Sequence, residues 1–221
     1  MQKFLITGSN RGIGLELSKQ LHKRGDYVIA SCRKSSEELN NLGVNVIENV
    51  DISSGHSITK LKSKIKDIKL DCLIHNAGIS EYNSFEDLDP DSIKKQFDVN
   101  ALSPLCMTRS LINLFNKKSK IAFITSRMGS IDDNTSGSSY GYRMSKVALS
   151  MAAKSLSIDL IKKEIFVGIL HPGLVSTRMT GYTNNGISTK ESAKGLLERI
   201  DSLNSSNSGK FFHANGEELP W

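Results

Sequence analysis

Short apolar runs alternate with longer amphipathic stretches along the whole chain. The runs have the length of strands, and the stretches space their apolar residues as one face of a helix does. Candidate strands are Lys3 to Thr7, Tyr27 to Cys32, Val44 to Val50, Asp71 to His75, Lys120 to Ser126, Phe166 to His171 and Lys210 to His213. Candidate helices are Gly12 to Arg24, Ser35 to Leu42, Ser54 to Lys66, Pro90 to Phe115, Tyr142 to Lys163 and Thr189 to Leu203. This alternation predicts an α/β fold.

The order of these segments also predicts their arrangement in space. Parallel strands need a crossover connection, and the helices of such connections cover the sheet. We therefore expect one Rossmann-type domain over residues 1–221, a doubly wound parallel sheet of about seven strands with helices on both faces. The polar loops Asp132 to Ser139 and Tyr182 to Ser188 follow carboxyl ends of strands, where ligands bind, so both are expected to border a site. Ser103-Pro104 is predicted to cap a second helical segment after a break around Asn100.

Composition and charge exclude several classes of function. The 221 residues are 38% hydrophobic and 24% charged, which is typical of a folded globular domain. The net charge is +6, but the lysines from Lys60 to Lys69 form the polar face of an amphipathic helix, without interleaved aromatic residues for base stacking. No apolar stretch approaches the roughly 18 residues of a membrane span. We expect no nucleic-acid partner and no membrane partner.

The cysteines bear on the cellular compartment. Cys32, Cys72 and Cys106 lie far apart, and their number and spacing predict neither a disulfide framework nor a metal site. The N-terminal run Phe4-Leu5-Ile6 is too short for the core of a signal peptide. We therefore expect a cytoplasmic protein in a reducing environment.

A glycine-rich loop, Thr7-Gly8-Ser9-Asn10-Arg11-Gly12-Ile13-Gly14, stands between the first strand and the first helix. Glycines there let the backbone turn tightly, approach a diphosphate and pack the helix on the strand. A glycine cluster alone is often only a turn, but this position predicts a dinucleotide site.

The end of the second strand bears on which dinucleotide binds. An NAD site usually carries an acidic residue there for the ribose hydroxyls, whereas this chain reads Ser31-Cys32-Arg33-Lys34. Arg33 can meet a 2′-phosphate through its planar fork, and Arg11 can approach the same group. We expect NADP(H) as the cofactor; the alternative is that both arginines are ordinary solvated surface residues.

Tyr142 and Lys146 are the candidate proton-transfer pair. They lie four residues apart at the start of a predicted helix, so their side chains share a face. A tyrosine ordinarily ionises near pH 10, and a neighbouring ammonium favours the phenolate. Tyr140 lies off this face, so we assign it to packing or to the rim of the pocket.

Together these motifs resemble the short-chain dehydrogenase/reductase superfamily over nearly the whole chain. The loop spacing T-G-x-x-x-G-x-G is followed by Asp51, the turn His75-Asn76-Ala77-Gly78 and Y-x-x-x-K, in the family's order. The stretch Thr125-Ser126-Arg127-Met128-Gly129-Ser130-Ile131 and the ending Gly216-Glu217-Glu218-Leu219-Pro220-Trp221 resemble the C-factor and sniffer-type carbonyl reductase branch.

The resemblance implies roles for individual residues. The implied catalytic residues are Asn100, Ser126, Tyr142 and Lys146. The implied cofactor-binding residues are Gly8, Ser9, Asn10, Arg11, Gly12, Ile13, Gly14, Arg33, Asp51, Ile52, Asn76, Ala77, Gly78, Tyr142, Lys146, Pro172, Gly173, Val175 and Thr177. Ser130 is the alternative to Ser126, and Asn100 could instead be an ordinary capping residue. His75 stands where the family has asparagine; we leave it without a role in the chemistry and expect it in the core or behind the site.

The resemblance also implies a reaction. Hydride passes from the reduced nicotinamide to a carbonyl carbon while Tyr142 protonates the oxygen and Ser126 polarises it. Lys146 lowers the pKa of the tyrosine, orients the nicotinamide ribose and relays the proton through a water at Asn100. The chain is expected to be an NADP(H)-dependent oxidoreductase of a small aldehyde or ketone, or of the corresponding alcohol.

Further expectations concern the pocket and the assembly. A short lid is expected near residues 174–190, and Met128, Met179 and Tyr182 are candidates to line the pocket. We expect a homodimer or homotetramer through the helices that contain Leu111 and Met151.

Two other classes of function are weighed against this hypothesis. Gly137-Ser138-Ser139-Tyr140-Gly141 satisfies G-x-S-x-G, but the polar residues before it are not the strand that a serine hydrolase needs. A C-factor-like signalling protein that binds the dinucleotide without turnover is the second alternative. The filled catalytic positions favour an enzyme.

Overall fold

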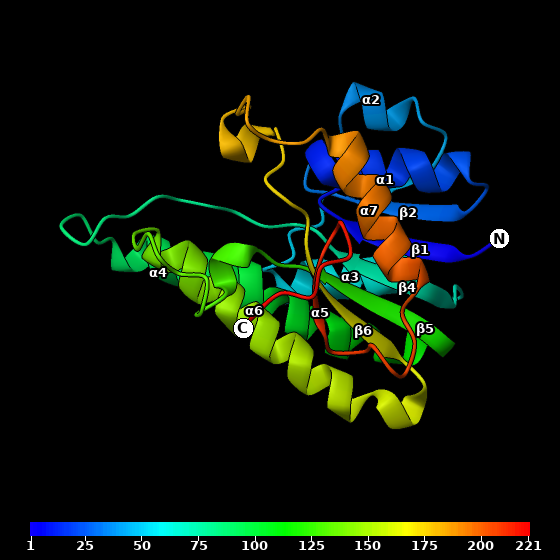
Figure 1. Ribbon diagram of the computed structural model, residues 1–221. Coiled ribbons are helices and arrows are strands. Elements are labelled where there is room, and N and C mark those ends of the chain that lie inside the picture. The colour runs from blue at the N-terminus through cyan, green and yellow to red at the C-terminus, as the bar shows by residue number, and fades with distance from the viewer.

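One parallel sheet forms the centre of the computed structural model, which describes residues 1–221 (Figure 1). Its strands are β1 (Lys3–Thr7), β2 (Tyr27–Ser31), β3 (Asn45–Ile47), β4 (Leu70–His75), β5 (Phe115–Ile124), β6 (Phe166–His171) and β7 (Phe211–His213). Their order is β3-β2-β1-β4-β5-β6-β7, and every neighbouring pair is parallel. The chain order reverses between β1 and β4, which confirms the doubly wound topology and opens a crevice at their carboxyl ends.

Helices cover both faces of this sheet. They are α1 (Gly12–Lys23), α2 (Glu37–Asn40), α3 (Gly55–Lys64), α4 (Pro90–Phe97), α5 (Ser103–Leu111), α6 (Tyr140–Asp159) and α7 (Thr189–Asp201). Because side chains alternate along a strand, Phe4 and Ile6 of β1 pack with α1 and α7, whereas Leu5 packs with α3, α5 and α6. The two hydrophobic cores lie on opposite faces of the sheet. None of these helices combines the length and the apolar composition that a membrane-spanning helix requires.

The stretch predicted as one helix with a break is continuous but changes its winding. A π-helical turn, Asp98–Leu102, joins α4 directly to α5. Ser103 is not an N-cap as predicted, because it has helical φ and ψ of −62° and −46°. Its amide bonds to the Asp98 carbonyl five residues back, and its Oγ donates to the same oxygen at 2.6 Å. The extra residue is therefore absorbed by widening one turn, which also tolerates the missing N–H of Pro104.

Several boundaries differ from the predicted ones by a few residues. β5 begins at Phe115 and ends at Ile124, so Thr125 and Ser126 lie beyond the strand. α6 begins at Tyr140, two residues before Tyr142, so Tyr142 lies in the first turn of the helix. The connection from β4 to α4 is long and extended, and Figure 1 shows it passing beside the first turn of α6.

Candidate active site

The glycine loop is held against the turn that follows β4. Gly8 has a φ of +70°, and a Cβ on it would lie 2.9 Å from the Ala77 Cα. A Cβ on Gly14 would lie 2.3 Å from the Gly8 carbonyl oxygen and 2.5 Å from the Asn76 Nδ2. No side chain fits at either contact, so glycine is required at both positions.

Thr7 and Asn76 tie the two segments together. The Thr7 Oγ1 accepts hydrogen bonds from the amides of Asn76 and Ala77, both at 3.1 Å. The Asn76 Nδ2 donates to the carbonyls of Thr7 at 3.0 Å and Gly8 at 3.2 Å. The side chain of Asn76 therefore supports the loop from behind.

The N-terminus of α1 fits an anion such as a diphosphate. Its N-cap, Arg11, is extended at a φ of −164° and makes no side-chain capping bond. Leu15 is the first residue whose amide bonds within the helix, to the Arg11 carbonyl at 3.3 Å, so the amides before it remain available to a ligand. A Cβ on Gly12 would lie 3.7 Å from the Thr177 Cγ2, so the loop after β6 faces this end of the helix. Ile13 is half-buried in the first turn.

Two predicted cofactor residues use their side chains to bind the protein's own backbone. Ser9 is fully buried, its Oγ donates to the Ile6 carbonyl at 2.9 Å, and its amide bonds to the Ser31 carbonyl at 3.2 Å. The Asn10 Nδ2 donates to the Lys34 carbonyl at 2.9 Å. Both side chains shape the glycine loop in this structure.

Beyond the glycine loop, the ends of β2 and β3 carry the other cofactor-side residues. Arg33 and Arg11 are exposed, and neither makes an ion pair. The Asp51 Oδ1 accepts hydrogen bonds from the Ser53 Oγ at 2.7 Å and the Ser53 amide at 3.0 Å, and these bonds lower the pKa of Asp51, with a smaller contribution from Arg33. Ile52 is buried beside it. This corner is thus positive at β2, with a fixed carboxylate next to it.

Lys146 is buried close to Tyr142. The Lys146 Nζ lies 5.6 Å from the centroid of the Tyr142 ring and donates to the Ile124 carbonyl at 2.9 Å. The side chain is 5% exposed, and burial lowers the pKa of Lys146 to about 8 because the ammonium loses solvation. This lysine therefore gains or loses its proton near pH 8, slightly above neutral pH.

The pKa of Tyr142 shifts in the direction opposite to the one predicted. Burial raises it, because the phenolate would lose solvation, and the Ser126 hydroxyl acts the other way as a hydrogen-bonding partner. The effect of burial is the larger of the two, so the net shift of the Tyr142 pKa is upward. In this structure Tyr142 is a protonated phenol at neutral pH.

Of the two candidate serines, the structure brings Ser126 to Tyr142. Ser126 is buried two residues after the end of β5, and its Oγ accepts a hydrogen bond from the Met128 amide at 3.1 Å. Ser130 is also buried, but its Oγ accepts the Asp133 amide at 3.2 Å inside the polar loop.

Asn100 sits in the π-helical turn and clamps the chain after β4. Its Oδ1 accepts the Ile79 amide and its Nδ2 donates to the Ile79 carbonyl, both at 2.8 Å, and the Nδ2 also donates to the Ser145 Oγ at 3.0 Å. A Cβ on Gly78 would lie 3.1 Å from the Asn100 Oδ1 and 3.7 Å from the Lys146 Nζ. The side chain thus holds the turn at Gly78 next to the lysine, which is more than an ordinary helix cap does.

The segment after β6 forms a loop closed at its base. Gly173 has a φ of +89°, and the Ser192 Oγ donates to the Pro172 carbonyl at 2.7 Å. Val175 is buried and forms a β-bridge with Ile187. The two ends of the loop 174–188 are therefore held side by side. Met179 and Tyr182 of this loop are 51% and 66% exposed, so neither lines an enclosed pocket in this structure.

His75 lies in the core, as predicted. Its ring stacks on Phe123 with centroids 4.8 Å apart, and burial lowers its pKa to about 3. The Thr108 Oγ1 donates to the Pro104 carbonyl, so the His75 Nε2 donates to that hydroxyl at 2.8 Å. The imidazole is therefore neutral and structural.

Residues missed by the sequence analysis surround the start of α6. They are Asn83, Gln96, Arg143 and Ser145. Gln96 lies four residues before Asn100 on the same helical face, and that spacing could have indicated a shared partner. Tyr140 faces Phe85 of the β4–α4 connection, with ring centroids 6.4 Å apart.

Comparison with known proteins agrees with this architecture. A family model described as short chain dehydrogenase matches residues 2–188. The 1-hydroxy-2-glutathionyl-2-methyl-3-butene dehydrogenase of Rhodococcus sp. (strain AD45) is 37% identical over 226 residues, which cover 100% of both chains. The C-signal of Myxococcus xanthus is 41% identical over 155 residues, covering 69% of this chain and 93% of the relative.

Solved structures of carbonyl reductases share this fold over the whole chain. The NADPH-bound carbonyl reductase from chicken fatty liver has a TM-score of 0.91 at 26% identity, covering 100% of this chain and 99% of that one. The carbonyl reductase Sniffer of D. melanogaster has a TM-score of 0.90 at 27% identity and covers 100% of both chains. The predicted fold class and the predicted resemblance to C-factor and sniffer-type reductases are confirmed.

Proposed function

Because the chain belongs to the short-chain dehydrogenase/reductase family and is thus an oxidoreductase that uses a nicotinamide dinucleotide, we propose that it is an NADP(H)-dependent carbonyl reductase with Tyr142 as proton donor. The observation that carries the proposal is the meeting of Tyr142, Lys146 and Ser126 at the carboxyl end of β5. Ser126 lies after β5, and Tyr142 and Lys146 lie in α6. The order of the sheet places this end of β5 near the glycine loop that follows β1.

In the proposed reaction each residue has one task. The bound cofactor supplies the hydride. Tyr142 gives its proton to the substrate oxygen, and the raised pKa of Tyr142 keeps this proton in place at neutral pH. Ser126 donates a hydrogen bond to the same oxygen as charge develops on it. Lys146 holds the nicotinamide ribose, and Asn100 fixes the turn beside Lys146.

We assign NADP(H) rather than NAD(H) on charge. Arg33 and Arg11 are exposed, carry no ion-pair partner and stand at the positive corner of the site. A guanidinium binds a phosphate with two parallel hydrogen bonds, so both arginines fit the 2′-phosphate. The NADPH-bound state of the chicken reductase supports the assignment.

For the substrate we propose a small, partly apolar aldehyde or ketone, or the corresponding alcohol. The loop 174–188, proposed as the lid, exposes Leu174, Met179 and Ile187 beside the catalytic end of the sheet. The Rhodococcus relative is named for a 1-hydroxy compound that carries a glutathionyl group, which is a primary alcohol and so supports an aldehyde or its alcohol as the reacting group.

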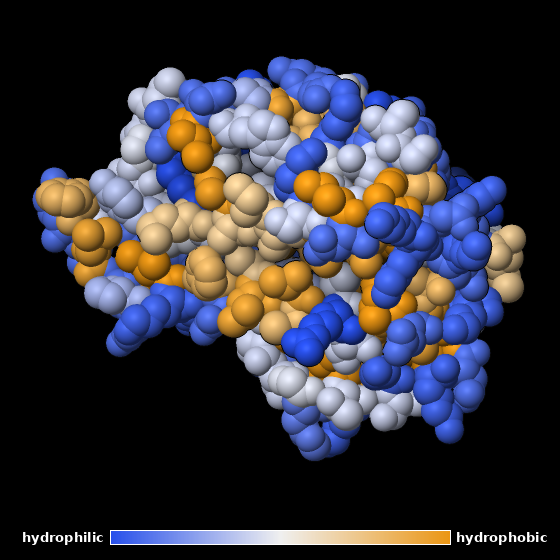
Figure 2. Space-filling view, turned by 90° about the horizontal axis from the view of Figure 1, so that it is seen from below, coloured by the Kyte–Doolittle hydropathy of each residue, from blue (hydrophilic) through white to orange (hydrophobic).

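We also propose that the protein is a homodimer or homotetramer. Of the two helices predicted to form the interface, α5 buries Leu111 inside the subunit, so any contact through α5 would use its other side chains. Met144, Met151 and Ile158 of α6 are at least half exposed, and apolar side chains gather on the face seen from below (Figure 2). A large exposed apolar patch is typical of a protein interface.

The test is an assay with NADPH and NADH against a panel of aldehydes and ketones. We expect faster oxidation of NADPH, and equal use of both cofactors would contradict the assignment of Arg33. Tyr142→Phe should lower kcat by about 10²- to 10⁴-fold, since the proton donor is lost. NADPH binding, followed by fluorescence titration, should persist; full turnover in this variant would overturn the role of Tyr142.

Similarity to the C-signal supports a second candidate, a dinucleotide-binding signal without turnover. Such a role would survive Tyr142→Phe, because the substitution leaves the glycine loop unchanged. A wild-type protein that binds NADPH but oxidises it with no carbonyl in the panel would favour this candidate.

A further inference from the structure

The chain between the cofactor-side turn and the first turn of α6 is bound at every second residue. We call residues 79–83 the strap. Ile79, Glu81 and Asn83 are half-buried or buried, whereas Ser80 and Tyr82 between them are exposed. Because side chains of an extended chain alternate, one edge of the strap faces the protein throughout. The strap thus connects Gly78, beside Lys146, with the start of α6.

α6 begins without a cap of its own. Its N-cap residue, Ser139, has left-handed φ and ψ of +51° and +42° and makes no side-chain capping bond. Asn83 supplies both missing acceptors: its carbonyl accepts the Ser139 amide at 2.7 Å, and its Oδ1 accepts the Gly141 amide at 3.3 Å. Asn83 is 3% exposed, so solvent does not replace these bonds. The cap comes from a residue 58 positions away in the sequence.

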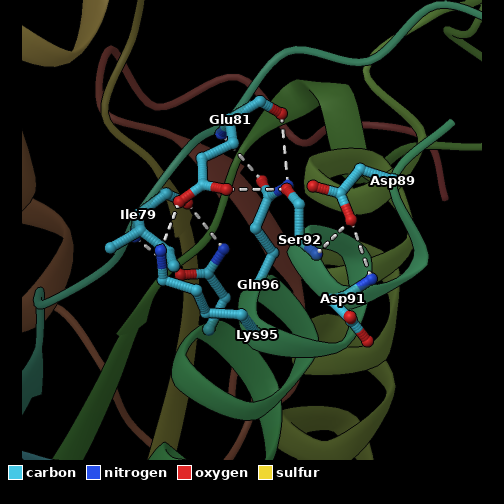
Figure 3. Close-up of polar contacts among 8 residues, drawn as sticks. Ile79, Glu81, Asp89, Asp91, Ser92, Lys95 and Gln96 are labelled. Carbon is cyan, nitrogen blue, oxygen red and sulfur yellow. Dashed lines mark hydrogen bonds and ion pairs between the residues drawn. The ribbon is translucent and has the colours of Figure 1, made fainter. Parts of the chain in front are cut away.

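Gln96 of α4 holds the middle of the strap (Figure 3) and packs against the same turn of α6. It is fully buried; its Oε1 accepts the Glu81 amide at 3.0 Å, and its Nε2 donates to the Glu81 carbonyl at 3.2 Å. A Cβ on Gly141 would lie 2.6 Å from the Gln96 Nε2. Gly141, the residue before Tyr142, is therefore packed directly on this amide.

The Glu81 side chain also ties the strap to α4, through a charged contact (Figure 3). The Glu81 carboxylate accepts hydrogen bonds from the Lys95 Nζ and the Ser92 Oγ, both at 2.7 Å. These partners lower the pKa of Glu81. The strap is thus tied to α4 by its backbone and by a side chain.

We propose that Asn83 is a positioning residue for the reaction: it fixes the first turn of α6 and so the direction of the Tyr142 phenol toward Ser126. The proposal rests on the proposed role of Tyr142 as proton donor. Gln96 and Asn100 hold the strap so that Asn83 meets α6 in one register. Asn83 does not touch the reacting atoms.

The test compares Asn83→Ala with the wild-type protein. We expect kcat to fall about 10- to 100-fold, because a small misplacement of a catalytic group costs this much. The dissociation constant of NADPH should stay unchanged, since the glycine loop is not touched. Hydrogen exchange at the Gly141 amide should become faster, which measures the cap independently of turnover.

Asn83→Asp is the conservative variant. Its carboxylate keeps the acceptor for Gly141, so kcat and the protection of the Gly141 amide should recover. The added negative charge disfavours the phenolate, so the pH at which activity changes with ionisation of Tyr142 should move upward. Ser84→Ala is the matched control, because the Ser84 Oγ accepts the Asp87 amide within the same connection and makes no hydrogen bond to α6.

Three outcomes would overturn the proposal. They are a kcat of Asn83→Ala within about twofold of wild type, an Asn83→Asp variant as slow as Asn83→Ala, and unchanged exchange at Gly141. If Asn83→Ala does not fold, Asn83→Ser replaces it, since the shorter hydroxyl cannot reach Gly141. A wild-type protein without turnover would count against the proposed function, whereas the exchange measurement would still test the cap.

Discussion

At the scale of single residues, burial sets the chemistry of Tyr142 and Lys146 more than their mutual charge does. Burial raises the pKa of the phenol and lowers the pKa of the ammonium, so both groups are pushed toward their neutral forms. The sequence showed that the two side chains share a helical face, but it could not show that the ammonium is buried and the phenol half-buried. Their spacing was predictable and the direction of the Tyr142 shift was not.

Lys146 makes stability depend on pH in a window that its pKa defines. The folded-state pKa is about 8, below the ordinary lysine value of 10.5, so between these values the unfolded chain binds the extra proton. Stability of the unliganded protein should therefore rise from pH 8 to pH 10.5 through this group. Lys146→Met removes the buried charge and should gain stability relative to wild type at pH 7, by up to roughly 3 kcal/mol, and lose that gain by pH 10.5.

Urea unfolding of both proteins at pH 7 and pH 10 measures this difference. Lys60→Met, at an exposed lysine of α3, is a control that should show no such change. An equal difference at the two pH values would contradict the lowered pKa of Lys146.

Arg33 should decide between the two dinucleotides. Arg33→Glu removes the proposed phosphate partner and adds a carboxylate that can bind ribose hydroxyls. We expect the NADPH dissociation constant to rise about 10- to 100-fold, as for loss of a charged hydrogen bond, with NADH binding unchanged or tighter. Lys34→Glu, one residue on, is the control; an equal loss in both variants would point to general electrostatic attraction.

At the scale of elements, the start of α6 is strained and held from outside. Gly137, Ser138 and Ser139 all have positive φ, between 51° and 63°, which is costly for the two serines. The Arg143 guanidinium binds this loop through the carbonyls of Gly137 and Ser138 and the Ser136 Oγ, and it also donates to the Met128 carbonyl at 3.3 Å. Arg143 thus links the loop to the turn that follows Ser126.

This arrangement predicts opposite effects of two substitutions. Arg143→Met should destabilise the protein by about 1–3 kcal/mol, because part-buried carbonyls lose hydrogen bonds from a charged donor. Ser138→Gly should stabilise it by up to about 1 kcal/mol, because glycine relieves the left-handed strain. Both are measured by urea unfolding of the unliganded protein, and a stabilising Arg143→Met would show that the loop does not need this guanidinium.

Elements were predictable where they depend on local pattern. β1 and β6 have the predicted bounds, since each is a buried apolar run that ends at turn residues. The π-helical turn at Asp98–Leu102 was not predictable, because a shift from i−4 to i−5 hydrogen bonding requires no particular residue type. The cap from Asn83 was equally hidden, since it lies in a segment without periodicity and reaches α6 only through the tertiary fold.

At the scale of the whole molecule, the proposed assembly depends on the outer face of α6. Met151 is 65% exposed in the single subunit. Met151→Lys would bury an ammonium in the proposed interface, which costs about 3–5 kcal/mol, so the dimer should dissociate in analytical ultracentrifugation. Asp67→Lys, at an exposed site after α3, should leave the oligomeric state unchanged in the same measurement. A monomeric wild-type protein would exclude the assembly.

The support of the glycine loop by Thr7 and Asn76 has a consequence for synthesis on the ribosome. The two residues lie 69 positions apart, yet the bonds between them hold Gly8 in its left-handed turn. A nascent chain that has released only β1 and α1 carries every glycine of the loop but lacks the wall against which they pack. Cofactor capture therefore has to wait until β4 has emerged, and the tyrosine and lysine reach the growing domain later still.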